Sequence, residues 1–206
     1  MKHIIRTVAL VLVISMLSVA AFAAEGFVPS VEQKDEPQVV APKTEVDGKP
    51  AVVVKDADGK IMAADDPEVV KVTPMSKAKD QTPEVKQKME EAFTDIAEAK
   101  DLTVIAPELK DVMKEMKVET PVENLVVRDL INLEVSEALV EALKTEGNSL
   151  ELSFEMELEE DQQLIVMVKG EDGKWVVIPA EDVTVNADGT VTVKFTVVGV
   201  IAFVVA

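Results

Sequence analysis

The fold of this chain is indicated first by the stretch Leu150-Glu151-Leu152-Ser153-Phe154-Glu155-Met156-Glu157-Leu158. Large apolar residues occupy every second position, and the positions between them hold Glu or Ser. Because successive side chains of a strand point to opposite faces, this alternation predicts a β-strand with one buried face and one solvated, acidic face.

Further strand-like runs follow on both sides of this stretch. Residues 164–168 and 175–178 flank the turn Glu171-Asp172-Gly173, and residues 183–185 and 190–195 flank the turn Ala187-Asp188-Gly189. Asp-Gly turns between apolar runs predict two hairpins. Residues 125–135 and the closing run 197–206 complete a set of about six short strands, which is typical of an antiparallel Greek-key β-sandwich.

A helical period precedes these strands. The spacing predicts a helix over about residues 83–99, which Thr82 caps and in which Pro83 is the first residue. Its apolar stripe consists of Val85, Met89, Ala92, Phe93 and Ile96. Pro107 opens a second helix, whose apolar face holds Leu109, Val112, Met113 and Met116 and which ends before Pro121. Ser136 caps a short third helix through Leu143, for which a long loop is the alternative. The fold class is therefore α+β, with two or three short helices followed by an antiparallel Greek-key β-sandwich-like domain over residues 82–206.

The segment before Thr82 has a different composition. Seven of the ten prolines lie between residues 29 and 83, among Glu, Asp, Lys and Val. Such a segment buries little apolar surface, so residues 24–81 are predicted to form a flexible, acidic, Pro-rich arm. For residues 51–72, the alternative to a flexible arm is a small hairpin, which turns at Asp58-Gly59, or a strand that joins the main domain.

Residues 1–23 have the pattern of an export signal. Lys2 and Arg6 precede an apolar run, which ends at Ala21-Phe22-Ala23. This pattern predicts cleavage after Ala23, with an uncleaved membrane anchor as the alternative. We therefore expect a protein that is secreted, extracellular or associated with the cell envelope and that is not stably inserted in a membrane after cleavage. Cleavage would change the formal charge from −18 to −20, since two basic residues and no acid are lost.

The mature chain has little chemistry for catalysis. His3 is the only histidine, the whole sequence lacks Cys and Tyr, and Arg128 is the only arginine after processing. These absences exclude a Ser-His-Asp triad, a Cys nucleophile and a zinc site with His or Cys ligands. No Ser lies in a Gly-x-Ser-x-Gly elbow, and few aromatic residues are present to form a sugar-binding platform. The acidic charge disfavours nucleic acid. We therefore expect a non-enzymatic protein with no catalytic, cofactor-binding or metal-binding residues.

Calcium is the metal whose binding motif the sequence matches best. Asp56, Asp58 and Gly59 match the third, fifth and sixth positions of an EF-hand loop, but Val54 stands at the first position and Asp65 at the twelfth, where a Glu belongs. A turn stabilised by Asp and Gly is the preferred interpretation. The acidic row over residues 151–161 would likewise be a solvated face rather than a cation site.

Two single residues have alternative interpretations. Trp175 begins a strand, where its ring either packs into the core or projects as a binding platform, and we favour the core. Arg128 stands beside Asp129 in a predicted strand, which favours an ion pair between them over a ligand site.

Several segments together carry a resemblance. They are Asp101-Leu102-Thr103, residues 124–130, Gly173-Lys174-Trp175-Val176-Val177, residues 188–193 and Ile201-Ala202-Phe203-Val204-Val205. Over roughly residues 83–206 the chain resembles small secreted or cell-surface proteins of Gram-positive anaerobes, which implies a helical part and a β-sandwich-like module without an assigned catalytic site.

These observations lead to one expected function and one alternative. We expect a structural or interaction module at the cell envelope or outside the cell, whose partner is an envelope or extracellular protein or glycan. The alternative is a weak carbohydrate- or calcium-binding adhesion module. A buried Trp175 favours the first, and an exposed Trp175 favours the second.

Overall fold

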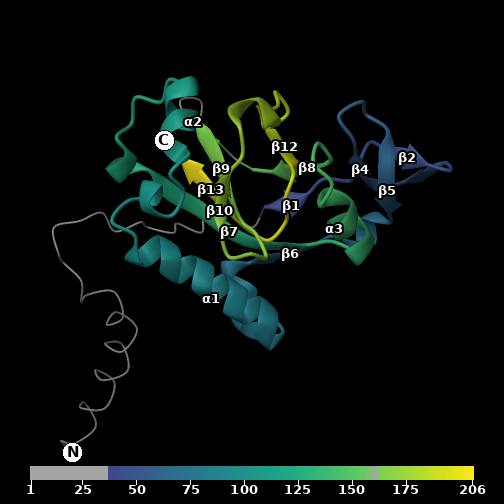
Figure 1. The fold of residues 1–206 in the computed structure, drawn as a ribbon, viewed down its shortest axis with the longest axis horizontal. Helices are drawn as coiled ribbons and strands as arrows, with labels where there is room; N and C mark the ends of the chain where they lie inside the picture. Colours follow the sequence, from purple (N-terminus) through teal and green to yellow (C-terminus); the bar gives the residue numbers. More distant parts are fainter. Residues whose placement is uncertain (1–36, 157, 160–161) are drawn as a thin grey trace, which may run out of the picture.

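The computed structural model describes residues 37–156, 158–159 and 162–206, and its strands form two main sheets (Figure 1). Sheet A has the order β10 (Trp175–Val177), β9 (Leu164–Lys169), β13 (Val200–Val205), β7 (Val126–Glu134), β6 (Lys71–Pro74). Sheet B has the order β11 (Val183–Val185), β12 (Thr190–Phe195), β8 (Ser149–Glu155), β4 (Val52–Lys55), β5 (Ile61–Asp65), with β1 (Gln38–Val39) also beside β8. A small hairpin joins β2 (Glu45–Val46) to β3 (Lys49–Pro50).

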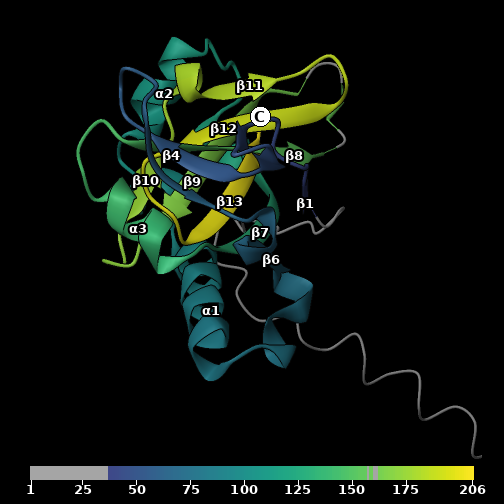
Figure 2. The same ribbon diagram turned by 90° about the vertical axis from the view of Figure 1, so that its right-hand side faces the viewer.

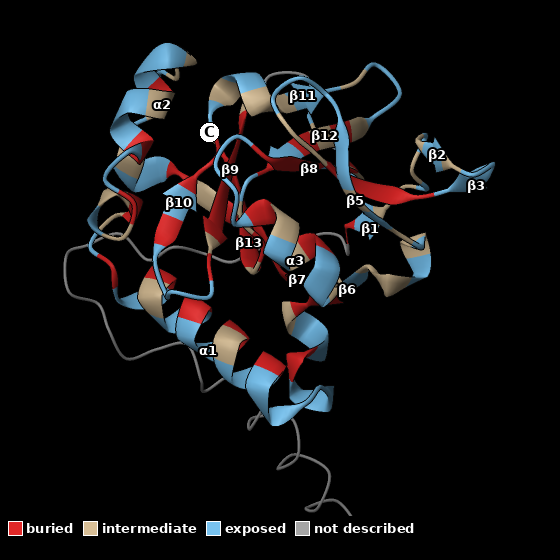
Figure 3. Ribbon diagram, turned by 45° about the vertical axis from the view of Figure 1, so that its right-hand side comes forward, coloured by how far each residue is buried: buried red, intermediate tan, exposed pale blue. Residues whose placement is uncertain are grey.

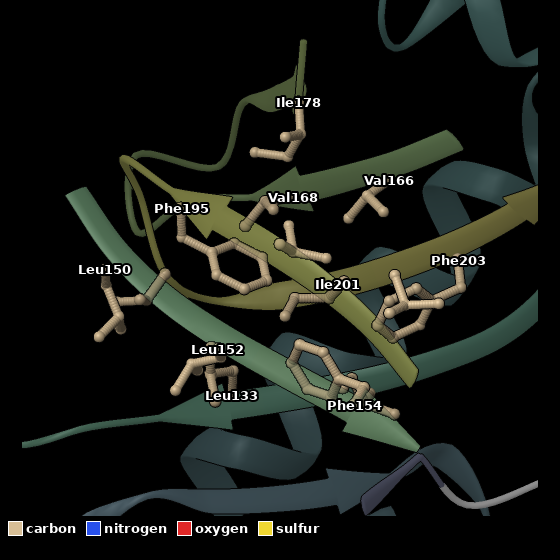
Figure 4. Close-up of a cluster of buried hydrophobic side chains, with 14 of the residues drawn as sticks. Leu133, Leu150, Leu152, Phe154, Val166, Val168, Ile178, Phe195, Ile201 and Phe203 are labelled. Atoms are coloured by element: carbon tan, nitrogen blue, oxygen red, sulfur yellow. The ribbon is translucent and has the colours of Figure 1, made fainter. Parts of the chain in front are cut away.

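The apolar faces of sheets A and B meet in a shared core (Figure 4). The ring of Phe154 on β8 makes edge-to-face contacts with Phe195 on β12 at a centroid distance of 6.1 Å and with Phe203 on β13 at 5.4 Å. Leu150, Leu152 and Phe154 are buried while Glu151 and Glu155 are exposed. The alternation predicted for residues 150–158 is confirmed as far as Glu155, where β8 ends, and position 157 lies outside the described residues.

Helices cover the other face of sheet A. Buried side chains of α1 (Pro83–Glu98) and α2 (Leu109–Glu115) join a second apolar cluster with Val127, Met167 and Ala202. Both views place α1 on the side of the molecule opposite β12 (Figures 1 and 2). Thr82 caps α1 as predicted, since its Oγ1 accepts a hydrogen bond from the N–H of Val85. Phe93 was expected in the buried stripe but is 39% exposed, because the stripe centres on positions 85, 89, 92 and 96.

A third helix, α3 (Glu137–Leu143), is present where a loop was the alternative. The hydroxyl of Ser136 caps its first turn by accepting from the N–H of Leu139, and Leu139 and Leu143 enter the core between the sheets. Short 3-10 helices complete the secondary structure: η1 (Pro67–Val69), η2 (Met75–Asp80), η3 (Leu102–Val104), η4 (Val122–Asn124) and η5 (Ala180–Asp182). No helix in the described ranges is both long and apolar enough to cross a membrane.

We expected a flexible arm over residues 24–81, and the structure differs wherever it describes this range. Val52 and Val54 of β4 lie in the core between the sheets, and β4 pairs with β8. The β4–β5 hairpin turns at Asp58-Gly59, as the alternative proposed, but β6 pairs with β7 in the other sheet. Short Val-rich runs are enough for burial once a long strand is available beside them. The export signal over residues 1–23, and residues 24–36 of the arm, lie outside the described residues.

The chain is thus a mixed α and β structure with antiparallel sheets, consistent with the α+β class. The predicted order, helices followed by strands, is wrong, because β1 to β6 precede α1. Pro74 is compatible with its place at the end of the edge strand β6, since an edge position does not need every N–H for pairing.

Candidate functional site

A cleft of about 660 Å³ lies between the first half of α1 and α3, where β7 ends and β13 begins. We call it the α1–α3 cleft; its walls also include the turn between β9 and β10. Figure 3 shows α1 and α3 on either side of the end of β7, with many exposed positions on both helices. Four segments far apart in the sequence therefore meet around one hollow.

The side chains around the cleft are mostly acidic. Its lining contains six glutamates, namely Glu84, Glu91, Glu134, Glu137, Glu141 and Glu171, and three lysines, namely Lys88, Lys144 and Lys169. Glu84 pairs with Lys88 at 3.1 Å and Glu141 with Lys144 at 2.6 Å. Within the described residues no ion pair is found for the other four glutamates, so the cleft has a negative charge that its own lysines do not balance.

The electrostatics of one lysine show that the two walls influence each other. The hydrogen bond from Lys144 to Glu141, followed by the charge of Glu141, raises the pKa of Lys144 above its usual value. The charge of Glu171, on the β9–β10 turn, acts in the same direction. The acidic field is therefore shared between α3 and the turn opposite.

Asn132 lies at the floor of the cleft. Only 2% of this residue is exposed, and its side-chain Nδ2 is buried without a hydrogen-bond partner in the described structure. Ile131 and Leu133 on either side enter the core between the sheets, so Asn132 faces the helices. A buried amide donor with no acceptor is unusual in proteins and calls for an explanation.

Neither the α1–α3 cleft nor Asn132 was identified from the sequence. Residues 125–135 were interpreted as an apolar strand, in which Asn132 stands on the face that alternates with Ile131 and Leu133. The amide of Asn132 within an otherwise apolar run could have indicated the site, because polar residues at core positions are rare unless they are hydrogen-bonded.

Trp175 lies in the core, as predicted. It is 6% exposed and belongs to the apolar cluster beneath α1 and α2. Its indole Nε1 donates a 2.9 Å hydrogen bond to Oδ2 of Asp95, which also lies 2.7 Å from Nζ of Lys169. The one indole of the chain is therefore not available as a platform for a ligand.

Arg128 and Asp129 form the ion pair that was expected, with Nε and Oδ2 3.6 Å apart and both side chains buried. The register of β7 against β13 shifts here, because Phe203 lies opposite Asp129 and Val204 opposite Val127. Arg128 thus has no residue opposite it, which is the geometry of a β-bulge. The pair is part of the interior rather than of an open site.

The residues of the calcium alternative are not brought together. Oδ1 of Asp56 accepts from the N–H groups of Asp58 at 3.0 Å and Lys60 at 2.9 Å, which stabilises the β4–β5 turn. Asp65 lies opposite Val52 at the other end of this hairpin and accepts a hydrogen bond from Ser136. Among the described residues, no group of three or more His, Cys, Asp or Glu is arranged to hold a metal ion.

Other residues of interest have structural surroundings. Glu151 and Glu155 are on the exposed face of β8, while positions 157, 160 and 161 of the acidic row are outside the described residues. Ser153, which lies between Glu151 and Glu155 on β8, shares a 2.8 Å hydrogen bond with Thr192 of β12. A hollow of about 350 Å³ lies beside this face, and no aromatic side chain lines it.

Comparison of the chain with protein-family models gave no match, and searches of curated proteins and of solved structures also gave no significant match. The site therefore has to be interpreted from its own residues. Carboxylates, lysines and an amide can bind a ligand by charge and hydrogen bonds.

Proposed function

We propose that this chain is an exported, non-enzymatic, acidic protein that acts as a structural or interaction module at the cell envelope or outside the cell. The observation that carries the proposal is the burial of Trp175 and its hydrogen bond to Asp95. A buried indole cannot stack against a ligand, and this was the feature that separated a structural or interaction module from an adhesion module.

The lining of the hollows gives further support. Neither the α1–α3 cleft nor the hollow beside β8 has an aromatic side chain among its lining residues, so a sugar ring would find no stacking surface in either. The carboxylate of Asp56 is occupied by its own turn. These contacts do not favour the alternative of a carbohydrate- or calcium-binding adhesion module.

Two further parts of the proposal rest on the sequence, and a third rests on the order of the strands. Export follows from the pattern of residues 1–23, and relationship to secreted or cell-surface proteins of Gram-positive anaerobes follows from the segments quoted above. We also propose a Greek-key β-sandwich for the two sheets, because strands distant in sequence are neighbours in each sheet.

The experiment that tests the function is a pull-down with the mature chain, residues 24–206, immobilised and incubated with solubilised envelope components. Protein partners that are retained by the folded chain and released by salt support an interaction module. The matched control is the Gly199→Ala variant, which keeps the charge but is expected not to fold. Release of the bound material by EDTA would support the adhesion alternative and contradict the proposal.

A further inference from the structure

We propose that the α1–α3 cleft binds a basic, Lys- or Arg-containing segment of a partner polypeptide. This inference rests on the proposed function as an interaction module and adds the site and the chemistry of the partner. Two independent observations support it: the unbalanced acidic charge of the cleft and the buried, unpartnered amide of Asn132 at its floor.

The four glutamates for which the described part of the chain supplies no ion pair surround the cleft. Glu91 comes from α1, Glu134 from β7, Glu137 from α3 and Glu171 from the β9–β10 turn. Since they lie on four elements, a ligand in the cleft would meet a carboxylate on several sides. The chain as a whole has a formal charge of −18, which would also attract a basic segment from a distance.

Asn132 narrows the chemistry of the ligand. Its Nδ2 donor is buried and has no acceptor among the described residues, and a carbonyl oxygen of a ligand that enters the cleft would supply one. A metal ion or a polyamine has no acceptor for it, whereas the backbone of a peptide presents a carbonyl at every residue. A ligand that has both positive charge and carbonyl oxygens is a basic polypeptide.

Apolar side chains in the same cleft fit this ligand as well. Val85 of α1, Val140 of α3 and Val200 of β13 are part of its lining. Lys and Arg side chains place their methylene groups along apolar surface while the charged end reaches a carboxylate. The cleft therefore offers contacts to the backbone, the stem and the charge of a basic residue.

The binding experiment uses the mature chain and fluorescence anisotropy of a labelled, end-blocked hexapeptide of alternating Lys and Gly. Spermine, which has positive charge but no carbonyl, is titrated as a competitor. The Glu137→Gln/Glu171→Gln variant should bind the peptide about 5-fold more weakly at low salt, as expected for the loss of two exposed charge pairs. The control Glu151→Gln/Glu155→Gln has the same change of charge on the outer face of sheet B and should stay within about 2-fold of the wild type.

Asn132→Leu tests the carbonyl contact. It should weaken the peptide about 5-fold or more and leave the affinity for spermine unchanged, because only the peptide supplies an acceptor. If this variant does not fold, the side-chain amide signals of Asn132 in the ¹⁵N–¹H spectrum of the wild type give the same information, since they should shift when the peptide is added. Amide signals that do not move, or an Asn132→Leu variant with wild-type affinity, would overturn the carbonyl contact.

Failure of this inference can be distinguished from failure of the proposed function. Equal weakening by both glutamate double variants would show that net charge alone attracts the peptide, which overturns the cleft as the site. A protein partner retained equally by the wild type and by Glu137→Gln/Glu171→Gln in the pull-down leaves the interaction module standing and overturns the cleft. Spermine that competes as well as an unlabelled peptide would show a general site for cations and would also overturn the proposal.

Discussion

Oδ2 of Asp95 accepts a 2.9 Å hydrogen bond from the indole Nε1 of Trp175 and lies 2.7 Å from the ammonium group of Lys169. One carboxylate on α1 thus joins the helix to β10 and to the end of β9. The side chain of Lys169 is only 11% exposed, so loss of this partner would leave a largely buried ammonium group without its acceptor. The contact holds α1 on sheet A, and Lys169 also lines the α1–α3 cleft.

Replacing Asp95 by Ala should lower the free energy of unfolding by about 2 kcal/mol, because a largely buried ammonium group and an indole N–H lose their acceptor together. Urea unfolding followed by circular dichroism measures this change. Trp175→Phe is the matched control: it keeps an aromatic ring and the Asp95–Lys169 pair, and it should cost only about 1 kcal/mol. An Asp95→Ala variant as stable as the wild type would show that the contact contributes nothing.

Gly199→Ala should prevent stable folding. The backbone of Gly199 has a φ of 154°, and an added Cβ would lie 2.1 Å from the carbonyl oxygen of Lys169. Strain of this size directly before a packed strand costs at least about 3 kcal/mol. Gly189→Ala is the control, since it has a φ of 84° but free space around the added Cβ, and it should cost about 1 to 2 kcal/mol. Thermal unfolding of the two variants checks the difference, and similar melting temperatures would contradict it.

Phe154→Ala should destabilise the core by about 3 to 5 kcal/mol, because a large side chain that contacts Phe195 and Phe203 leaves a cavity between the sheets. Phe93→Ala on the exposed side of α1 should change the stability by less than about 1 kcal/mol. Guanidinium unfolding of both variants tests whether burial, rather than the loss of a ring as such, sets the cost. Equal losses of stability in the two variants would show that burial does not set the cost.

A chain that begins at residue 82 should not fold cooperatively, whereas one that begins at residue 37 should. The shorter chain lacks β4 and β6, so Leu150 on β8 and Ile131 on β7 lose the strands that pair with them. Differential scanning calorimetry of the two chains shows whether each has a cooperative transition. A cooperative transition for residues 82–206 would support the flexible arm that the composition of residues 24–81 predicts.

The contrast between α1 and β4 shows which parts of this fold could be predicted from the sequence. The stripe of α1 and the alternation of β8 repeat over enough residues for the period to be recognised. β4 has only four residues, and it is stabilised by pairing with β8, which lies almost a hundred positions later. Neighbouring prolines and acids therefore outweighed its Val residues in the sequence-based interpretation.

The candidate site could not be predicted from the sequence for a related reason. Asn132 and Glu137 lie close together in the sequence, but Glu91 and Glu171 reach the same cleft only through the packing of α1 and of the β9–β10 turn on sheet A. A local pattern does not encode such a meeting of distant segments. The position of Trp175 at the start of a strand was predicted correctly because it is a local feature, but that position alone left open whether the ring is buried.

Asp101 gives a prediction for the dependence of stability on pH. Its carboxylate accepts hydrogen bonds from the hydroxyl of Thr103 and, at 2.9 Å, from the N–H of Thr103. The hydroxyl bond is the main cause that lowers the pKa of Asp101 below its ordinary value. A carboxyl whose pKa is lowered by folding stabilises the folded state above its unfolded pKa, and this contribution is lost as the pH falls through the folded pKa.

Thr103→Val removes the hydroxyl bond and should raise the pKa of Asp101 toward its ordinary value. The variant should therefore be less stable than the wild type at neutral pH, and the difference in the free energy of unfolding should shrink as the pH falls below about 3.8. Urea unfolding over a pH series measures the difference, and a ¹³C NMR titration of the Asp101 carboxyl measures the pKa. Thr94→Val is the control, because the Thr94 hydroxyl donates to the backbone carbonyl of Glu90 and to no carboxylate. Its effect should not change with pH through this contact, and a Thr103→Val effect that is equally constant would show that the hydrogen bond does not shift the titration of Asp101.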